Sequence, residues 1–297
     1  MKFREEKDSM GKLNVPEDAL YGATTQRALL NFPISDLRFN RTFIKSIAEI
    51  KRCAAETNLE LGTLEKNIAD EIIKAAELVS KGDYDSEFVV DIFQTGSGTS
   101  TNMNTNEVIS NVAIKNMGGV IGSRDPIHPN DHVNKGQSSN DVIPTAIHIA
   151  GCVGIVESLI PGLEKLQKSL EKKSEEFWRI IKTGRTHLQD ATPIRLGQEF
   201  LGYSGQIEES IRRAKNSLSE LSVLALGGTA VGTGIGMQKG FSNKVIEKLS
   251  KRFNIKFSES PNHFHSQSTI DAIVASSGNL KTIAVSLMKI GNDIRWL

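Results

Sequence analysis

The second half of this 297-residue chain contains three runs of helical periodicity, each longer than an ordinary globular helix. They extend from Asp141 to about Phe177, from Leu196 to about Leu226, and from Ser268 to Leu297. Pro144 is expected in the first turn of the first run, and Pro161 is expected to kink it. Successive long amphipathic helices predict a bundle whose apolar faces require partners.

Shorter elements are predicted in the first half of the chain. Residues 1–40 show little periodicity and are expected to form an extended arm. A helix is predicted from Arg41, and a second one, antiparallel to it, between Thr63 and Gly82. Strand signals are sparse. We therefore predict an all-α fold with an N-terminal domain over residues 1–138 and a long-helix bundle over residues 139–297.

Charge and cysteine content limit the functional classes. Lys and Arg number 36 against 35 Asp and Glu, a formal net charge of +1, so no bulk field attracts nucleic acid or an anionic membrane. Cys53 and Cys152 stand in helix-like runs, which favours reduced thiols and a reducing compartment. The N-terminus has no apolar targeting region, and no stretch is expected to approach 18 uncharged apolar residues. A cytoplasmic protein without a membrane segment is predicted.

Three polar segments interrupt the helical pattern, from Thr95 to Asn102, from His128 to Asn140 and from Lys182 to Asp190. Each is expected to run into a helix. A helix start offers free backbone N–H groups and a partial positive charge, and nearby hydroxyl and amide groups add neutral donors, a combination that suits carboxylates. Taken singly, each segment is a weak signal, because Ser, Thr and Asn before a helix are usually ordinary helix caps.

Four longer runs carry a more specific signal, in the order GSGTSTNMNTNEVI (Gly96 to Ile109), HPNDHVNKGQSSNDVIPTA (His128 to Ala146), KTGRTHLQDATPIRLGQEF (Lys182 to Phe200) and GGTAVGTG (Gly227 to Gly234). Together they resemble the class II fumarases of the fumarase/aspartase superfamily. The resemblance implies a fumarate hydratase, a lyase of the tricarboxylic acid cycle that converts fumarate and L-malate reversibly without metal or cofactor. Such a reaction abstracts a proton beside a carboxylate, so donors must stabilise an aci-carboxylate intermediate.

The resemblance also assigns roles to residues. His187 would act on the water molecule, as an imidazole that titrates near neutral pH can; a capping or core histidine is the structural alternative. The substrate-binding set would comprise donors and the loop residues that shape their site: Ser97, Gly98, Thr99, Ser138, Ser139, Asn140 and Thr186. Neither Asp190 nor Glu199 is assigned as the carboxylate that orients His187.

A second dicarboxylate site, outside the catalytic pocket, is implied for His128, Pro129, Asn130 and Asp131. The alternative is a rigid loop that positions residues 138–140. His263 and His265 form an H-x-H pair, but no third ligand stands near them in the sequence, so no metal site is predicted.

Other members of the superfamily are the closest alternatives. Aspartate ammonia-lyases usually have Gln where this chain has His187, and STND where it has SSND from Ser138 to Asp141. Argininosuccinate and adenylosuccinate lyases carry different versions of the first two motifs. A catalytically inactive structural or binding protein with the same fold is the alternative of a different class.

In the family, four subunits pack their long helices into a central bundle, and segments of three chains build each active site. A homotetramer that binds a small dicarboxylate is therefore expected. In the family, the run GNDIRWL (Gly291 to Leu297) is followed by a loop of the type GSS-x-MPxKxN, which carries the proton-abstracting serine and a lysine. These 297 residues do not include that loop, so we expect them to be inactive alone.

Overall fold

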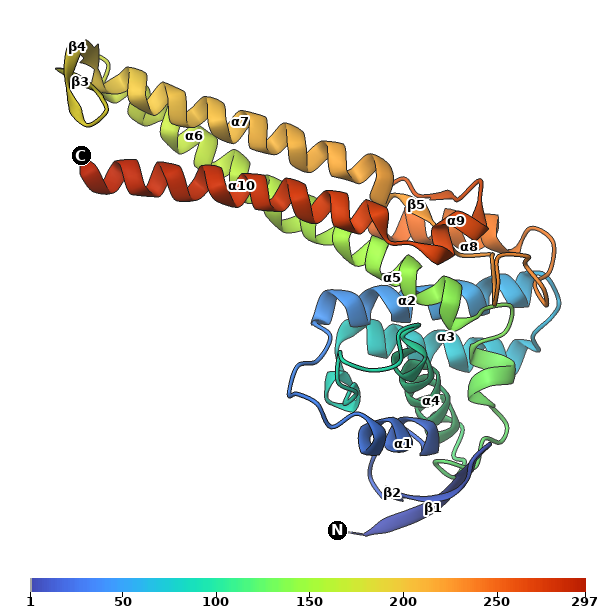
Figure 1. Ribbon diagram of the computed structural model, residues 1–297. Helices are drawn as coiled ribbons and strands as arrows, with labels where there is room; N and C mark the ends of the chain where they lie inside the picture. Colours follow the sequence, from blue (N-terminus) through green and yellow to red (C-terminus); the bar gives the residue numbers. More distant parts are fainter. Residues whose placement is uncertain (1) are drawn as a thin grey trace. The chain divides into compact units, whose positions relative to one another are not determined.

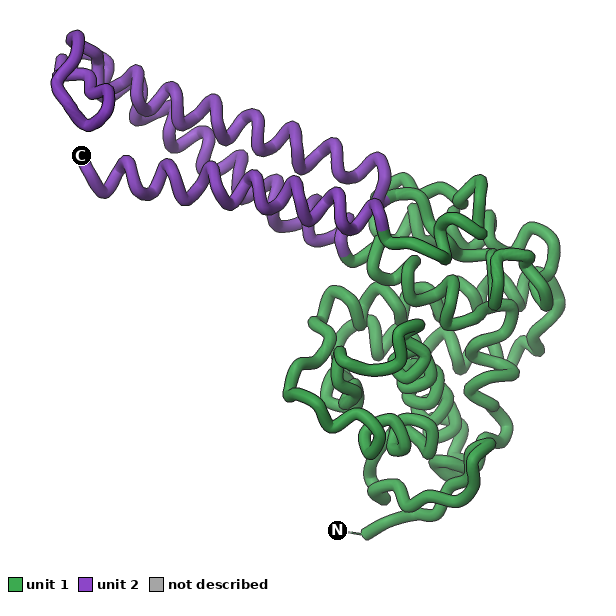
Figure 2. The backbone as a smooth tube through the Cα atoms, viewed as in Figure 1, with its two compact units in different colours: residues 1–150, 222–270 green, residues 151–221, 271–297 purple. Residues whose placement is uncertain are grey.

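The computed structural model describes residues 2–297, which form two compact units (Figure 2). Unit 1 contains the described residues up to Ala150 together with Ser222–Ile270, and unit 2 contains Gly151–Leu221 and Asp271–Leu297. Helices dominate both units, which confirms the all-α prediction. The units do not divide at residues 138 and 139, because a later segment returns to unit 1; a family domain boundary at that point stays a prediction.

Unit 1 surrounds α2, α3 and α4, which Figure 1 shows in blue to dark green. Its elements are β1 (Phe3–Asp8), β2 (Gly11–Pro16), α1 (Ala23–Asn31), α2 (Arg41–Glu60), α3 (Lys66–Lys81), η1 (Asp85–Glu87), α4 (Thr99–Asn116), η2 (Pro129–Val133), the start of α5 (Ser139–Gly154), β5 (Val223–Leu224), α8 (Phe241–Phe253), β6 (Ser258–Glu259) and α9 (His263–Ser268).

The helix pair α2 and α3 forms as the apolar spacing predicts. The side chain of Asn40 caps α2 by accepting a hydrogen bond of 3.0 Å from the backbone N–H of Phe43. The residue after α3 is Gly82, whose φ of 102° suits a glycine C-cap. The apolar faces of α2, α3 and α4 meet in a core that includes Ala48, Ile72 and Ile109, all 0% exposed.

The N-terminal arm is more ordered than the sequence pattern suggested. β1 and β2 pair antiparallel, from Phe3 opposite Pro16 to Asp8 opposite Gly11. The following helix α1 has no side-chain cap of its own. Instead, the buried carboxylate of Glu107 on α4 accepts hydrogen bonds from the backbone N–H groups that begin α1. Because this carboxylate comes from more than 80 residues away, local periodicity could not reveal the helix.

The first long run forms a continuous helical segment from Ser139 to Glu176. It consists of α5, a π-helical turn η3 (Ile155–Leu159) and α6 (Ile160–Glu176), so the irregularity lies just before Pro161. Pro144 lies inside α5 rather than in its first turn. The segment is long and apolar enough to cross a membrane by length and composition alone, with 39% of the relevant window buried, which corrects the sequence expectation. Core helices of bundles meet the same criterion.

In unit 2 the long helix α7 (Leu196–Leu221) packs against both α6 and α10 (Asp271–Trp296) (Figure 1). The further elements of this unit are β3 (Ile181–Thr186) and β4 (Gln189–Arg195). Phe200 and Ile207 of α7 and Ile290 of α10 are buried in this packing. The other long runs are therefore helical as predicted, although α7 ends at Leu221, five residues before the expected Leu226.

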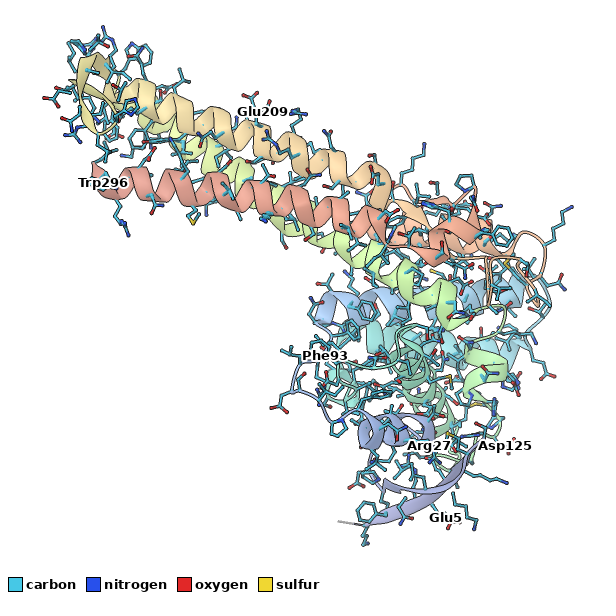
Figure 3. All side chains as sticks on the ribbon, in the orientation of Figure 1. Glu5, Arg27, Phe93, Asp125, Glu209 and Trp296 are labelled. Atoms are coloured by element: carbon cyan, nitrogen blue, oxygen red, sulfur yellow. The ribbon has the colours of Figure 1, made fainter. Side chains whose placement is uncertain are left out.

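One face of α10 carries apolar side chains that unit 2 does not cover. Val274 is 61% exposed, Met288 63% and Trp296 69%, and Figure 3 shows the Trp296 side chain at the end of the helix. Only Ser276, Ile283 and Ile290 of this helix are buried. The sequence-based expectation that the long helices present apolar faces in need of partners agrees with this exposure.

Candidate active site

The first polar segment positions Thr99 at the start of α4. Gly98 precedes it in the left-handed region at φ 68°. A Cβ atom at this position would lie 2.9 Å from two carbons of the Ile143 side chain, so glycine permits the loop to approach α5 closely. The hydroxyls of Ser97 and Thr99 hydrogen-bond each other at 2.8 Å.

The second polar segment forms the start of α5 through a capping box. The Ser138 hydroxyl accepts a hydrogen bond of 3.3 Å from the backbone N–H of Asn140, and the Asp141 carboxylate accepts one of 2.9 Å from the backbone N–H of Ser138. These bonds hold Ser138, Ser139 and Asn140 in a fixed turn. The amide of Asn140 also donates to the carbonyl of Ala230 at 2.7 Å.

Asp141 connects α5 to the glycine-rich segment from residue 227 to 234. Its second carboxylate oxygen accepts hydrogen bonds from the backbone N–H groups of Gly227 at 3.1 Å and Thr229 at 2.9 Å. The side chain is fully buried, and burial raises the pKa of Asp141 above its usual value although these hydrogen bonds and Lys51 oppose the shift. The Asp141 carboxylate therefore fixes the position of the glycine-rich segment relative to the start of α5.

The first two polar segments and the glycine-rich segment enclose a hollow of about 430 Å³ in unit 1. It contains four of the residues predicted to bind substrate, Thr99, Ser138, Ser139 and Asn140. The full lining is Thr99, Asn102, Met103, Asn130, Asn134, Gln137, Ser138, Ser139, Asn140, Thr229, Ala230 and Ile235. Its polar groups are neutral hydroxyls, amides and backbone, and two of its edges are helix starts, so the hollow suits a carboxylate without a local cation from this unit.

Ser97 contributes to a neighbouring hollow of about 500 Å³ rather than to this one. Asn140 lines both hollows, and the second has an apolar wall that includes Ile143, Pro144 and Phe264. Ser97 therefore reaches the predicted donors through its hydrogen bond to Thr99.

A second layer of side chains lies behind the donors. The amide nitrogen of Asn102 donates to the Ser139 hydroxyl at 3.0 Å and to the Asn134 side-chain oxygen at 3.3 Å. The Lys51 ammonium donates to that same oxygen at 2.8 Å and to the Gln137 side-chain oxygen at 3.1 Å. Burial lowers the pKa of Lys51 to about 7, against the opposing effect of the Asp141 carboxylate.

The third polar segment does not begin a helix, which corrects the sequence expectation. Thr186 and His187 lie at the turn of the β3–β4 hairpin, nine residues and more before α7 begins. The two arms are rich in β-branched residues such as Thr183, Thr192 and Ile194, which favour strands over a helix start. Two helix starts, not three, thus converge in unit 1.

His187 stands in a strained and exposed turn of unit 2. Its φ is 53° and that of Leu188 is 60°, values typical of a type I′ hairpin turn and unfavourable for side chains with a Cβ. Within residues 2–297 the His187 ring has no hydrogen-bond partner. A core histidine is therefore excluded in this unit. Glu199 is engaged by Lys182 at 3.0 Å, and Asp190 is exposed, so neither orients His187 here.

The predicted accessory segment forms the π-helical turn η2. The ring nitrogen Nδ1 of His128 caps it by accepting a hydrogen bond of 3.2 Å from the backbone N–H of Asp131. The backbone N–H of His128 donates to Nδ1 of His132 at 2.9 Å, and burial lowers the pKa of His132. These contacts fit a rigid loop that leads to residue 138, while Asn130 lines the 430 Å³ hollow. The accessory anion site stays a prediction.

The remaining polar clusters serve packing. His263 contacts the Glu259 carboxylate at 3.0 Å and the carbonyl of Ala225 at 3.1 Å. Among residues 2–297 no group of three or more His, Cys, Asp and Glu side chains gathers as a metal site. Cys53 and Cys152 are buried free thiols, and burial raises the pKa of each to about 12.

Sequence reasoning did not single out three residues that build the site. Asp141 could have been identified from the S-x-x-D pattern that precedes an apolar run. Asn102 lay in a quoted motif without an assigned role, and Lys51 carries no signal, because a lysine among apolar helix positions usually faces solvent.

Comparison with known proteins agrees with this geometry. A family model described as "Lyase" matches residues 11–297. The chain belongs to the lyase family. Among curated members, "Fumarate hydratase, mitochondrial" of Danio rerio is 51% identical over 99% of this chain and 58% of its own length, and "Fumarate hydratase class II" of Rickettsia bellii is 50% identical over 99% and 64%. The chain thus spans about three fifths of the length of these relatives.

Solved structures of the lyase family share the fold. The class II fumarase of Schistosoma mansoni matches with a TM-score of 0.95 and 39% identity, over 98% of this chain and 64% of that one. A fumarate lyase:delta crystallin from Brucella melitensis, bound to cobalt, matches with a TM-score of 0.94 and 39% identity, over 99% and 64%. The chain therefore shares the fold of lyases that include a class II fumarase.

Proposed function

We propose that the protein is a fumarate hydratase, which reversibly adds water to fumarate to form L-malate. The observation that supports this most is the convergence of Thr99, Ser138, Ser139 and Asn140 around one hollow at the starts of α4 and α5. Fumarate carries two carboxylates, and neutral donors at helix starts bind such groups without the desolvation cost of a buried cation.

The reaction passes through an aci-carboxylate after a proton leaves the carbon beside a carboxylate. Negative charge then gathers on the oxygens of that carboxylate, so fixed hydroxyl, amide and backbone donors stabilise the intermediate more than the substrate. The capping box of Ser138 and Asp141 holds these donors in place before the substrate arrives. Such preorganisation supports catalysis because the donors do not reorient during the reaction.

His187 is proposed to act on the water molecule that is added or lost, and Thr186 to contribute a further donor. Support comes from the exposure and strain of the turn that carries them. The left-handed backbone conformation of His187 and Leu188 is energetically unfavourable, and such strained residues cluster at functional sites.

The proposed assembly is a homotetramer whose active sites combine segments of several subunits. The uncovered apolar face of α10 and the apolar segment Ser139–Glu176 support it, because a bundle formed with other copies would cover both. No nucleic acid, membrane, metal or cofactor is part of the proposal, and the proposed location is the cytoplasm. The residues 128–131 are proposed as an accessory anion site.

The decisive experiment follows fumarate absorbance with purified protein expressed from its complete reading frame. Loss of absorbance with formation of L-malate is the expected result. Ammonia release from aspartate without fumarate hydration would replace the proposal with an aspartate ammonia-lyase. A folded protein that converts neither substrate would favour an inactive structural or binding protein with this fold.

A further inference from the structure

A lysine far from any solvent lies behind the donors of the hollow. Lys51 is on α2 and is 0% exposed. Its ammonium group contacts the side-chain oxygens of Asn134 and Gln137 at 2.8 and 3.1 Å. The group donates to both oxygens whether it is charged or neutral, because the neutral amine still has two N–H bonds. Both amides must therefore present their oxygen to Lys51, and an inverted amide at either position would set two donors against each other.

The orientation of Asn134 fixes that of Asn102. Because the Asn134 oxygen is an acceptor, the group of Asn102 that faces it at 3.3 Å must be the amide NH₂. The oxygen of the Asn102 amide does not decide its orientation, because it is buried and has no partner within residues 2–297. An inverted amide would place its nitrogen at the same position, also without a partner.

The same amide nitrogen then determines how Ser139 bonds. It donates to the Ser139 hydroxyl oxygen at 3.0 Å, so Ser139 is an acceptor on this side. The hydroxyl proton remains free for the hollow, which Ser139 lines. An ionised carboxylate only accepts hydrogen bonds, so only a hydroxyl that points its proton outward can bind it. If Asn102 were inverted, Ser139 would donate to the Asn102 oxygen and offer lone pairs to the substrate.

We propose that Lys51 is a positioning residue whose contact with Asn134 orients the amides of Asn134 and Asn102 and so makes Ser139 a donor to the substrate carboxylate. The inference rests on the proposed function, since it assigns a role within that binding site. Lys51 does not touch the substrate. Its effect passes through three hydrogen bonds. The amide nitrogen of Asn134 also donates to the Gln137 carbonyl at 3.3 Å, so removal of Lys51 takes away the shorter of the two bonds that orient this amide.

A double-mutant cycle tests this connection. Lys51→Met keeps an unbranched side chain and removes the donor, and Ser139→Ala removes the hydroxyl that the lysine orients. Each single variant is expected to lower kcat/KM for fumarate on the order of tenfold or more, the usual effect of losing a hydrogen bond to a charged group. In the Ser139→Ala background, Lys51→Met is expected to add no further loss, because no hydroxyl remains to be oriented.

Asn58 provides the matched control. It is also on α2 and is 2% exposed, and its amide donates to the carbonyl of Lys135 in the same loop at 3.0 Å, but it has no bond to the Asn134–Asn102 pair. Asn58→Leu loosens the loop without changing amide orientation. Its loss of kcat/KM should multiply with that of Ser139→Ala. If the losses of Lys51→Met and Ser139→Ala multiply in the same way, Lys51 merely supports the loop and the inference is wrong.

Two further measurements keep the result clear. If Lys51→Met does not fold by circular dichroism, Asn102→Leu replaces it in the cycle, because it breaks the same path one bond before Ser139. If the parent protein shows no turnover, the proposed function fails, and the cycle is then measured as fumarate binding by titration calorimetry. Affinity losses that multiply there overturn the positioning role separately, whereas losses that do not multiply support it.

Discussion

The carboxylate of Asp141 accepts a hydrogen bond of 2.9 Å from the backbone N–H of Thr229, a residue 88 positions later in the chain. The other oxygen of the same carboxylate closes the capping box with Ser138. One buried side chain thus joins the donors at the start of α5 to the glycine-rich segment, which also lines the hollow through Thr229 and Ala230.

Asp141→Asn is expected to destabilise the fold and weaken substrate binding together. An amide offers one acceptor oxygen in place of two, so either the capping box or the bonds to residues 227 and 229 are lost. The free energy of unfolding should fall by about 1–3 kcal/mol, the cost of unsatisfied buried groups, and KM for fumarate should rise. Urea unfolding measures the first effect. Asp190→Asn, at an exposed aspartate, serves as control and should leave both values near those of the parent.

Gly98→Ala is expected to disrupt the contact between the first loop and α5. The new methyl group would lie 2.9 Å from carbons of Ile143 and would occupy a left-handed conformation, which costs roughly 1–2 kcal/mol for a residue with a Cβ. Stability and kcat/KM should both decrease. The control is Gly96→Ala, where an added Cβ would have no neighbour within 4 Å. Equal effects at both positions would show that the close approach to Ile143 is unimportant.

His187→Asn should reduce turnover about a hundredfold or more, the usual contribution of a positioned acid or base. The melting temperature should change little, because the ring is exposed and has no hydrogen-bond partner within residues 2–297. Steady-state kinetics and calorimetry measure the two effects separately. Gln189→Ala on the same hairpin is the control. A large fall in melting temperature with unchanged turnover would assign His187 to structure instead of chemistry.

The stability of the parent protein should rise as pH increases from about 7 to about 10.5. Lys51 has a pKa of about 7 in the folded chain and an ordinary value near 10.5 when unfolded, so between these values the unfolded state binds more protons. The slope from one such group is at most about 1.4 kcal/mol per pH unit. The free energy of unfolding is measured with urea at three pH values for the parent and for Lys51→Met. If Lys51 causes the slope, the parent should show it and Lys51→Met should lack it.

Treatment with EDTA or exposure to air should leave fumarate hydration unchanged. The chain supplies two cysteines, both buried with pKa values raised to about 12, whereas an iron–sulfur cluster requires about four thiolate ligands. Activity is assayed before and after dialysis against the chelator. Loss of activity that iron restores would show that the reaction follows a different, metal-dependent chemistry.

Several properties could be predicted from the sequence because they depend on local pattern. The spacing of apolar residues predicted the long helices, and the polar runs near the starts of α4 and α5 predicted helix starts with neutral donors. The roles of Thr99, Ser138, Ser139 and Asn140 came from the resemblance to the family and not from local pattern. Hydrophobic periodicity and helix starts are both set by residues within a few positions of each other, so the chain itself carries the information.

Tertiary structure decided the features that depend on distant partners. The Glu107 carboxylate creates the start of α1, and strand pairing places His187 on a hairpin turn, although its segment reads as a helix approach. Burial turns Lys51, one of many lysines in the sequence, into a fixed donor behind the site. The pKa of a side chain and the direction of its hydrogen bonds depend on which groups surround it and exclude water. Only the folded chain determines which groups these are.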